Sequence, residues 1–148
     1  MVSIESFTIA DRMNELHGTI DASLARTAHH LDDDHLAAAA AALAELAVGL
    51  RRHIAVEEHH LFPAFARSPA ADLELLAAMN AQHREILALV ATMTEATAAH
   101  DRGAALQAKA ALHAALGVHD DEEEALCAAL DRTLDVSARA DLIAHLAG

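Results

Sequence analysis

The chain is poor in aromatic side chains, with no Trp, no Tyr and three Phe among 148 residues, although hydrophobic residues make up 54% of it. Much of that hydrophobic fraction is alanine, which has the highest intrinsic helix propensity, whereas β-strands are enriched in β-branched and aromatic residues. The composition therefore argues against a mainly β fold and against disorder. It predicts a single all-α domain over residues 1–148, which is long enough to bury one sizeable core.

Basic residues and cysteine are also scarce. Ten Lys and Arg face 23 Asp and Glu, which gives a formal net charge of −13. Proteins that bind nucleic acid or anionic membranes present a basic face, so we expect neither partner. The single cysteine, Cys127, excludes an internal disulfide, fits a reducing compartment and is interpreted as a small buried hydrophobe.

Long apolar runs are missing as well. The most apolar stretch, residues 36–50, is mostly alanine and contains Glu45, so it is interpreted as a core-facing helix and not as a membrane span. The first residues include Glu5 and lack the basic-then-apolar pattern of a signal peptide. We therefore expect a cytoplasmic protein, and the sequence leaves its oligomeric state open.

Turn signals divide the chain into four long helices and one short helix. The acidic residues 32–34 and the run 101–103 are expected to form turns, and Ser68-Pro69 is expected to start the third helix as an N-cap followed by proline. The predicted helices span residues 6–31, 35–67, 69–100, 104–132 and 136–147. Long helices of similar length with short connections predict an all-α, up-and-down antiparallel four-helix bundle, with its core at about 6–132 and a short C-terminal helix at about 136–147.

Proline at position 63 lies inside the second predicted helix. It removes the backbone hydrogen bond to the carbonyl of His59, so we expect a kink or an early end of the helix near this point.

Histidine is unexpectedly abundant, with 12 residues, although it is a mediocre helix former. Residues three, four and seven apart share one face of a helix. In the fourth predicted helix, one such stripe is apolar except at His119 and Glu123; its members are Leu112, Leu116, His119, Glu123, Leu126 and Leu130. The second helix repeats the pattern with Leu46, Leu50, His53, Glu57, His60 and Ala64.

The first and third helices add one core-facing histidine each, His17 and His83. Burying several imidazoles and carboxylates without partners would be costly, and a bound metal removes that cost by pairing them. Imidazole with carboxylate suits iron, manganese or zinc. Because carboxylates can bridge two metals, a dinuclear site is favoured, in which a solvent bridge and an open position for a small ligand complete the coordination.

These residues resemble the hemerythrin-like, cation-binding HHE family. The resemblance rests on His17, the His53-x-x-x-Glu57 run, His83, the His119-x-x-x-Glu123 run and the segment HIAVEEHHLFPAF at 53–65, and it covers roughly residues 10–132. It implies a hemerythrin-like bundle with a non-haem centre of two Fe ions, bridged by oxo or hydroxo and by two carboxylates. It also implies roles in binding, sensing or handling dioxygen, nitric oxide, peroxide or iron itself.

The sequence departs from the oxygen-carrying hemerythrins, whose third helix supplies two histidines four apart; here the second position is Leu87. Their fourth-helix carboxylate lies five residues after the histidine, where this chain has Glu124 as the alternative to Glu123. His60 is a candidate fifth histidine ligand, and Asp21 is interpreted as an outer hydrogen-bond partner or a surface residue. The predicted metal ligands are His17, His53, Glu57, His83, His119, Glu123 and His60.

Four functions follow from this pattern. The first is a diiron protein that binds, senses or handles a small molecule such as dioxygen, nitric oxide or peroxide. The second is a diiron oxidase or peroxidase-type enzyme. The third is an iron storage or trafficking protein, and the fourth is a plain helical interaction module. Manganese or zinc would suit the same ligand atoms.

Overall fold

A computed structural model describes residues 7–146 of the chain. Within that range every regular element is helical, and there is no strand: α1 (Ile9–Asp32), α2 (Leu36–Val56), the π-helical turn η1 (Glu57–Leu61), α3 (Phe62–Ala66), α4 (Leu73–Ala98), α5 (Arg102–Thr133) and α6 (Val136–Leu146). α2, η1 and α3 follow one another without a break and form one long helix. The predicted all-α class, with four long helices and a short C-terminal one, is confirmed.

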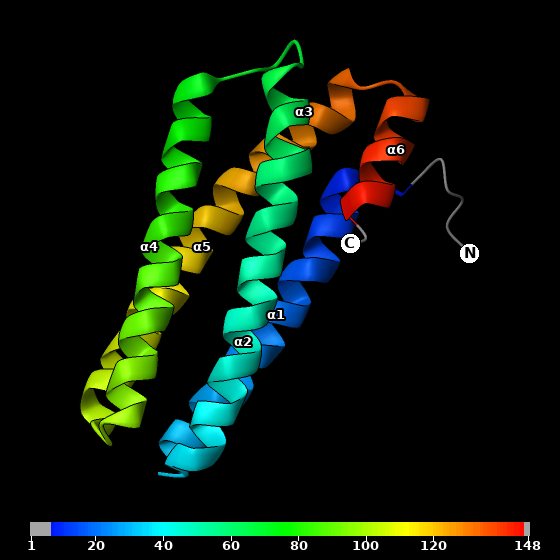
Figure 1. Cartoon of the computed structure of the whole chain (residues 1–148). Coiled ribbons are helices and arrows are strands. Elements are labelled where there is room, and N and C mark those ends of the chain that lie inside the picture. Colours follow the sequence, from blue (N-terminus) through cyan, green and yellow to red (C-terminus); the bar gives the residue numbers. More distant parts are fainter. Residues whose placement is uncertain (1–6, 147–148) are drawn as a thin grey trace.

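The four long helices form a bundle in which neighbours along the chain run antiparallel (Figure 1). α1 packs against α2 and α5, and α4 packs against the same two helices, so each long helix has two neighbours around the bundle. α6 folds back against α1 and η1. The predicted up-and-down arrangement is therefore confirmed, with the short C-terminal helix beside the first.

The N-terminal end of α1 is fixed by two sets of hydrogen bonds. Thr8 and Asp11 form a capping box, in which each side chain accepts a backbone N–H of the other. Asp131 of α5 then accepts the backbone N–H groups of Ile9 and Ala10, at 2.9 and 3.2 Å. Because these caps lie at Thr8, α1 begins at Ile9; the predicted start at Ser6 lies outside the described residues, as do the last residues of the predicted 136–147 helix.

The prediction that Ser68-Pro69 starts the third helix was wrong. The Ser68 hydroxyl donates to the carbonyl of Phe65 at 2.8 Å, so this serine closes the preceding helix. Asp72 caps α4 instead, because its carboxylate accepts the backbone N–H of Leu75 at 3.1 Å. Serine and aspartate are comparable N-caps, but the negative charge of Asp72 also suits the positive N-terminal end of a helix.

Proline 63 has the effect expected from its missing N–H. The α-helical pattern stops at Val56, and the backbone N–H of Phe62 donates to the carbonyl of Glu57, five residues earlier. This π turn directly precedes Pro63, and the helix ends at Ala66. Single π turns in α-helices are frequent at functional sites, and this one contains a predicted ligand.

Two apolar clusters fill the bundle, one on each side of a polar layer. Leu, Ile, Met and Ala side chains of α1, α2, α4 and α5 make up the larger cluster, which includes Leu46, Leu50 and Leu116. The other contains Phe62, Phe65 and Cys127 and is covered by α6. Cys127 is fully buried, as expected. Between residues 7 and 146 no helix is both long and apolar enough to cross a membrane.

Candidate metal centre

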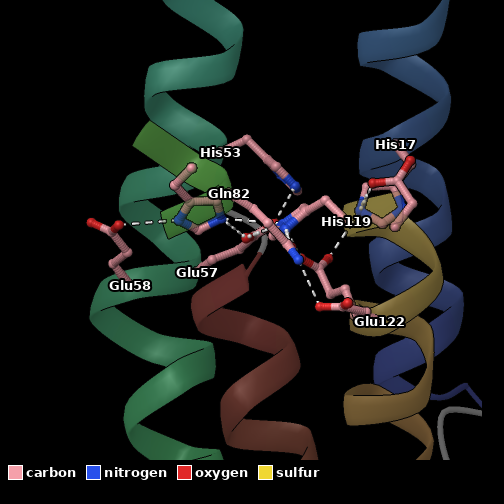
Figure 2. A network of polar contacts seen from close by, with 10 residues as sticks. His17, His53, Glu57, Glu58, Gln82, His119 and Glu122 are labelled. Atoms are coloured by element: carbon pink, nitrogen blue, oxygen red, sulfur yellow. Dashed lines mark hydrogen bonds and ion pairs between the residues drawn. The ribbon is translucent and has the colours of Figure 1, made fainter. Parts of the chain in front are cut away.

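The polar layer between the two apolar clusters contains six of the seven predicted ligands (Figure 2). Each long helix contributes at least one of them: His17 from α1, His53 and Glu57 from the α2–η1 junction, His83 from α4, and His119 and Glu123 from α5. Both glutamates are 0% exposed, and His83 and His119 are also buried. The histidines of the first two helices are slightly more open, with side chains 13% and 9% exposed.

Glu57 contacts three of the histidines, one through one carboxylate oxygen and two through the other. One carboxylate oxygen, Oε1, is 2.5 Å from Nε2 of His53. The other, Oε2, is 2.7 Å from Nε2 of His83 and 3.3 Å from Nε2 of His119. Its two oxygens therefore face two different positions, as the oxygens of a carboxylate that bridges two cations do.

Glu123 repeats this arrangement from the opposite side of the layer. Its Oε1 is 2.9 Å from Nε2 of His17, and its Oε2 is 3.1 Å from Nε2 of His119. The donor atoms thus fall into two sets. We call His17, His53 and the Oε1 atoms of both glutamates the open half-site, and His83, His119 and the Oε2 atoms the closed half-site.

Hydrogen bonds alone do not satisfy these buried atoms. Nε2 of His53, Oε1 of Glu57 and Oε2 of Glu123 are buried without a hydrogen-bond partner, although each lies close to another donor atom. Nε2 of His83 and Nε2 of His119 face each other at 3.2 Å. Such orphaned polar atoms are rare in native proteins, whereas a cation placed between them would coordinate them all. The ligand atoms of two groups, one of His17, His53, Glu57 and Glu123 and one of Glu57, His83 and His119, lie within 4.8 Å of one another.

The two histidines of the closed half-site are oriented by contacts at Nδ1, the ring nitrogen that faces away from the site. Nδ1 of His83 contacts Oε1 of Glu58 at 3.1 Å, and Nδ1 of His119 contacts Oε1 of Gln82 at 2.8 Å. Gln82 donates in turn to Glu122 at 2.7 Å. An acceptor at Nδ1 keeps the proton on that nitrogen and leaves the lone pair of Nε2 directed into the site. Such partners are typical of metal-ligating histidines.

The carboxylates favour the protonated forms of His119 and His17. Burial alone would lower the pKa of His119, but hydrogen bonds to Glu123 and Glu57 and their charges outweigh burial and raise it to about 10. Burial likewise opposes protonation of His17, and the hydrogen bond and charge of Glu123 raise its pKa. Burial would raise the pKa of Glu57, but the close contacts of its carboxylate with His119, His53 and His83 hold it well below its ordinary value. Without metal, protons on these histidines therefore offset the negative charge of the two carboxylates, as bound cations would.

A small cavity adjoins the open side of the layer. It has room for about one water molecule. Its polar wall comprises His17, Asp21, His53, His83, His119 and Asp120, and its apolar wall comprises Ile20, Leu50, Ile54, Ile86 and Leu116. A molecule in this cavity would lie between the histidine rings and a hydrocarbon surface.

The structure does not bring His60 into the layer. Its ring lies 4.9 Å from the ring of His145 on α6, in a separate groove. In an α-helix the third residue after Glu57 would lie about 60° from it around the helix axis. A π turn has more residues per turn, so each residue rotates less and the third residue after Glu57 lies at a larger angle from it. The sequence stripe assumed an α-helix throughout.

Glu124, Asp21 and Leu87 are not among the clustered donors. Glu124 is exposed while Glu123 is buried in the cluster, so the carboxylate four residues after His119 is the one that faces the site. Asp21 is exposed and lines the edge of the cavity. Leu87 is half-buried and offers no donor atom.

Sequence reasoning missed Gln82 and Asp120. Gln82 directly precedes His83, and its partner Glu122 directly precedes Glu123, so adjacency to both motifs was the available signal. Asp120 belongs to an acidic run that is typical of a solvated face, yet its carboxylate is 3.4 Å from Nε2 of His17. Burial, together with the charges of Glu123 and Asp21, raises the pKa of Asp120 to about 6.

Comparison with known proteins agrees with this geometry. Residues 8–130 match the family described as Hemerythrin HHE cation binding domain, while no curated protein and no solved structure matches the chain significantly. The matched segment begins at the N-cap of α1, ends within α5 and contains all six clustered residues. The chain therefore belongs to the hemerythrin HHE cation-binding domain family, and its histidine and glutamate clusters are metal-binding clusters.

Proposed function

We propose that the protein is a non-haem diiron protein that binds a small diatomic molecule, dioxygen or nitric oxide, or the similarly small peroxide. One iron would be held by the open half-site and the other by the closed half-site, with Glu57 and Glu123 bridging them. A bound iron pair would supply a redox-active Lewis acid with a free coordination position. The donor set supports this assignment, because imidazole and carboxylate suit iron.

The small cavity is the observation that carries the choice of ligand. It has room for about one water molecule and touches His17 and His53 on one side and Ile20 and Leu50 on the other. A diatomic molecule fits such a space with little rearrangement, whereas an organic substrate would require the core to open. Apolar walls favour a neutral ligand, because a charged one would lose its hydration there.

The protein residues set the charge and the geometry of the site. The two glutamates offset the charge of the cations, and Glu58 and Gln82 fix the rings of His83 and His119. The apolar side chains exclude bulk water, which strengthens every electrostatic contact inside the layer.

Two other functions are alternatives to this proposal, and one observation weighs against each. A diiron oxidase or peroxidase would need a donor of electrons and a site for it, and the chain has no Tyr or Trp to relay them. An iron storage or trafficking protein would release its metal readily, whereas both bridging carboxylates are fully buried. Manganese and zinc fit the same donors and are outcomes of the test. We also propose that the protein acts in the cytoplasm.

The test is to load the protein with ferrous iron and measure metal per chain together with the absorption spectrum. The proposal expects about two irons per chain, near-ultraviolet absorption of a bridged ferric pair in air, and a further spectral change when nitric oxide is added to the reduced protein. Two bound irons with no response to nitric oxide, dioxygen or peroxide would refute small-molecule binding and favour storage. A well-folded protein that binds no metal would refute the centre itself.

A further inference from the structure

A groove on the surface runs beside the buried cavity and shares two side chains with it. The groove lies between α1 and α2, and the C-terminal end of α6 closes one end of it. Its lining residues are Leu16, Thr19, Ile20, Gly49, Arg52, His53, Val56 and Leu146. Ile20 and His53 also line the cavity, so one side chain from each helix forms the partition between the two spaces.

We propose that this groove is the path by which a neutral diatomic molecule reaches the metal centre, with Ile20 and His53 as the gate. This inference rests on the proposed function. The groove is much larger than the cavity and is mostly apolar. Neutral diatomic molecules prefer apolar surfaces to water, so the groove would concentrate them against the gate.

The gate residues differ in what they can do. His53 is a predicted ligand of the open half-site, and its Nε2 faces Glu57, so its ring is fixed when a cation is bound. Ile20 is 8% exposed and makes no polar contact. A rotation of the Ile20 side chain is therefore the simplest motion that would connect the two spaces, and such rotations occur within nanoseconds.

The two half-sites support the same direction of approach. The histidines of the closed half-site are 1% and 3% exposed and have Glu58 and Gln82 behind them. The cavity borders the histidines of both half-sites, but those of the open half-site have no partner at Nδ1 among residues 7–146 and are the more exposed pair. A ligand that arrives through the groove would thus meet the half-site with the fewest contacts to break.

Gly49 gives a direct way to obstruct the groove. A Cβ atom built on Gly49 would meet no atom within 4 Å, so a side chain can start from this position without a clash at its first atom. Gly117 on α5 has the same free space and lies outside the groove and the cavity, which makes it the matched control. Because the chain has no Trp, the emission maximum of Gly49→Trp reports whether the new indole is buried in the groove.

The experiment measures association and dissociation rates of nitric oxide with reduced, iron-loaded protein. The groove proposal expects Gly49→Trp to lower both rates by the same factor, at least about fivefold, with unchanged iron content and affinity. Ile20→Ala should raise both rates, and Gly117→Trp should change neither. Unchanged rates in both Gly49→Trp and Ile20→Ala would overturn the path.

A second readout needs no metal. Under xenon pressure, crystals of the protein should show a xenon atom in the groove beside Leu16 and Val56, and Gly49→Trp should displace it. A groove that takes up no xenon would overturn the proposal on its own. If wild-type protein binds two irons and no nitric oxide, the proposed function fails; if it binds nitric oxide at rates that the gate variants do not alter, the path alone fails.

Discussion

The two half-sites use the same kinds of donor atom, imidazole nitrogens and carboxylate oxygens, yet their surroundings differ. In the closed half-site, the rings of His83 and His119 are buried and held at Nδ1 by Glu58 and Gln82. In the open half-site, the rings of His17 and His53 are partly exposed, and the cavity borders the rings of both half-sites. The difference favours our proposal that the closed half-site would anchor metal and the open half-site would exchange a ligand.

The π turn in the second long helix explains this difference between the half-sites. His83 packs face to face on Phe62, with ring centroids 5.3 Å apart and an angle of 9° between the planes. Phe62 directly follows the π turn that carries Glu57. The turn therefore places an aromatic support and the carboxylate of Glu58 on the closed side, while on the open side the rings of His17 and His53 contact each other edge to face and Asp120 lies 3.4 Å from His17.

The largest expected effect comes from a residue that both half-sites share. Glu123→Gln should abolish binding of both cations, because it removes one negative donor from each. Elemental analysis should then find almost no metal per chain. Glu124→Gln is the matched control, since this neighbour is exposed, and it should keep full loading; loss of metal in the control alone would reassign the bridging role to Glu124.

Acid should weaken metal binding strongly, and the effect should come mainly from the closed half-site. His119 has a pKa of about 10 in the metal-free protein, so a cation at neutral pH must displace its proton. The apparent affinity should therefore fall about tenfold for each pH unit per proton released. Calorimetric titrations in buffers of different ionisation enthalpy would count the protons, and zero released protons would contradict the assignment.

The same groups set the pH dependence of stability in the metal-free protein. The pKa of His119 is raised above its ordinary 6.5, so its contribution is complete below pH 6.5 and is lost as pH rises through 10. The pKa of Glu57 is lowered below its ordinary 4.5, so its contribution is complete above pH 4.5 and is lost at lower pH. Thermal melts in chelator should show greatest stability between these values, and a maximum above pH 8 would exclude this account.

A smaller effect is expected from the residues behind the histidines. Gln82→Leu removes the acceptor at Nδ1 of His119 and should lower the affinity of the closed half-site about 10- to 100-fold. Competition with a coloured chelator would measure it. Gln107→Leu, at an exposed position of α5, should leave the affinity unchanged; equal affinities in the two variants would mean that the closed half-site is not anchored as described.

The smallest effect is expected at Asp120, beside the open half-site. Asp120→Asn removes a carboxylate charge 3.4 Å from His17, but this carboxylate is 29% exposed and screened by water. The loss of affinity should be about two- to fivefold. Asp121→Asn, on the exposed face, should have no effect in the same chelator assay, and a loss above 100-fold for Asp120→Asn would make this residue a ligand.

The sequence allowed the fold, and the clustering of six of the predicted site residues in one layer, to be predicted, because α-helical periodicity holds wherever the helices are regular. The stripe through Leu112, His119, Glu123 and Leu130 is buried throughout. Predictions failed where local structure departs from that periodicity. His60 was misplaced because the π turn changes the number of residues per turn, and Ser68 was misplaced because two capping residues lay within five positions of each other.

Contacts between helices were the other limit. That Gln82 reaches His119 depends on how α4 and α5 pack, and no spacing within one helix contains that information. The contact of Asp120 with the site could not be predicted for a similar reason, because its neighbour His17 is on a different helix.

The π turn also acts as an insertion of one residue in an otherwise continuous helix. Deleting His59 would restore a regular α-helix and leave the residues after the turn in about their present orientation, whereas forcing the full-length segment into a regular α-helix would rotate everything after the turn by about 100° relative to α2. Phe62 would then leave the face of His83, although every metal ligand would still be present. Transfer of the His53–Glu57 motif into a designed straight helix would therefore carry over the donors without their aromatic support, and alignments of related chains should expect their gaps at this turn.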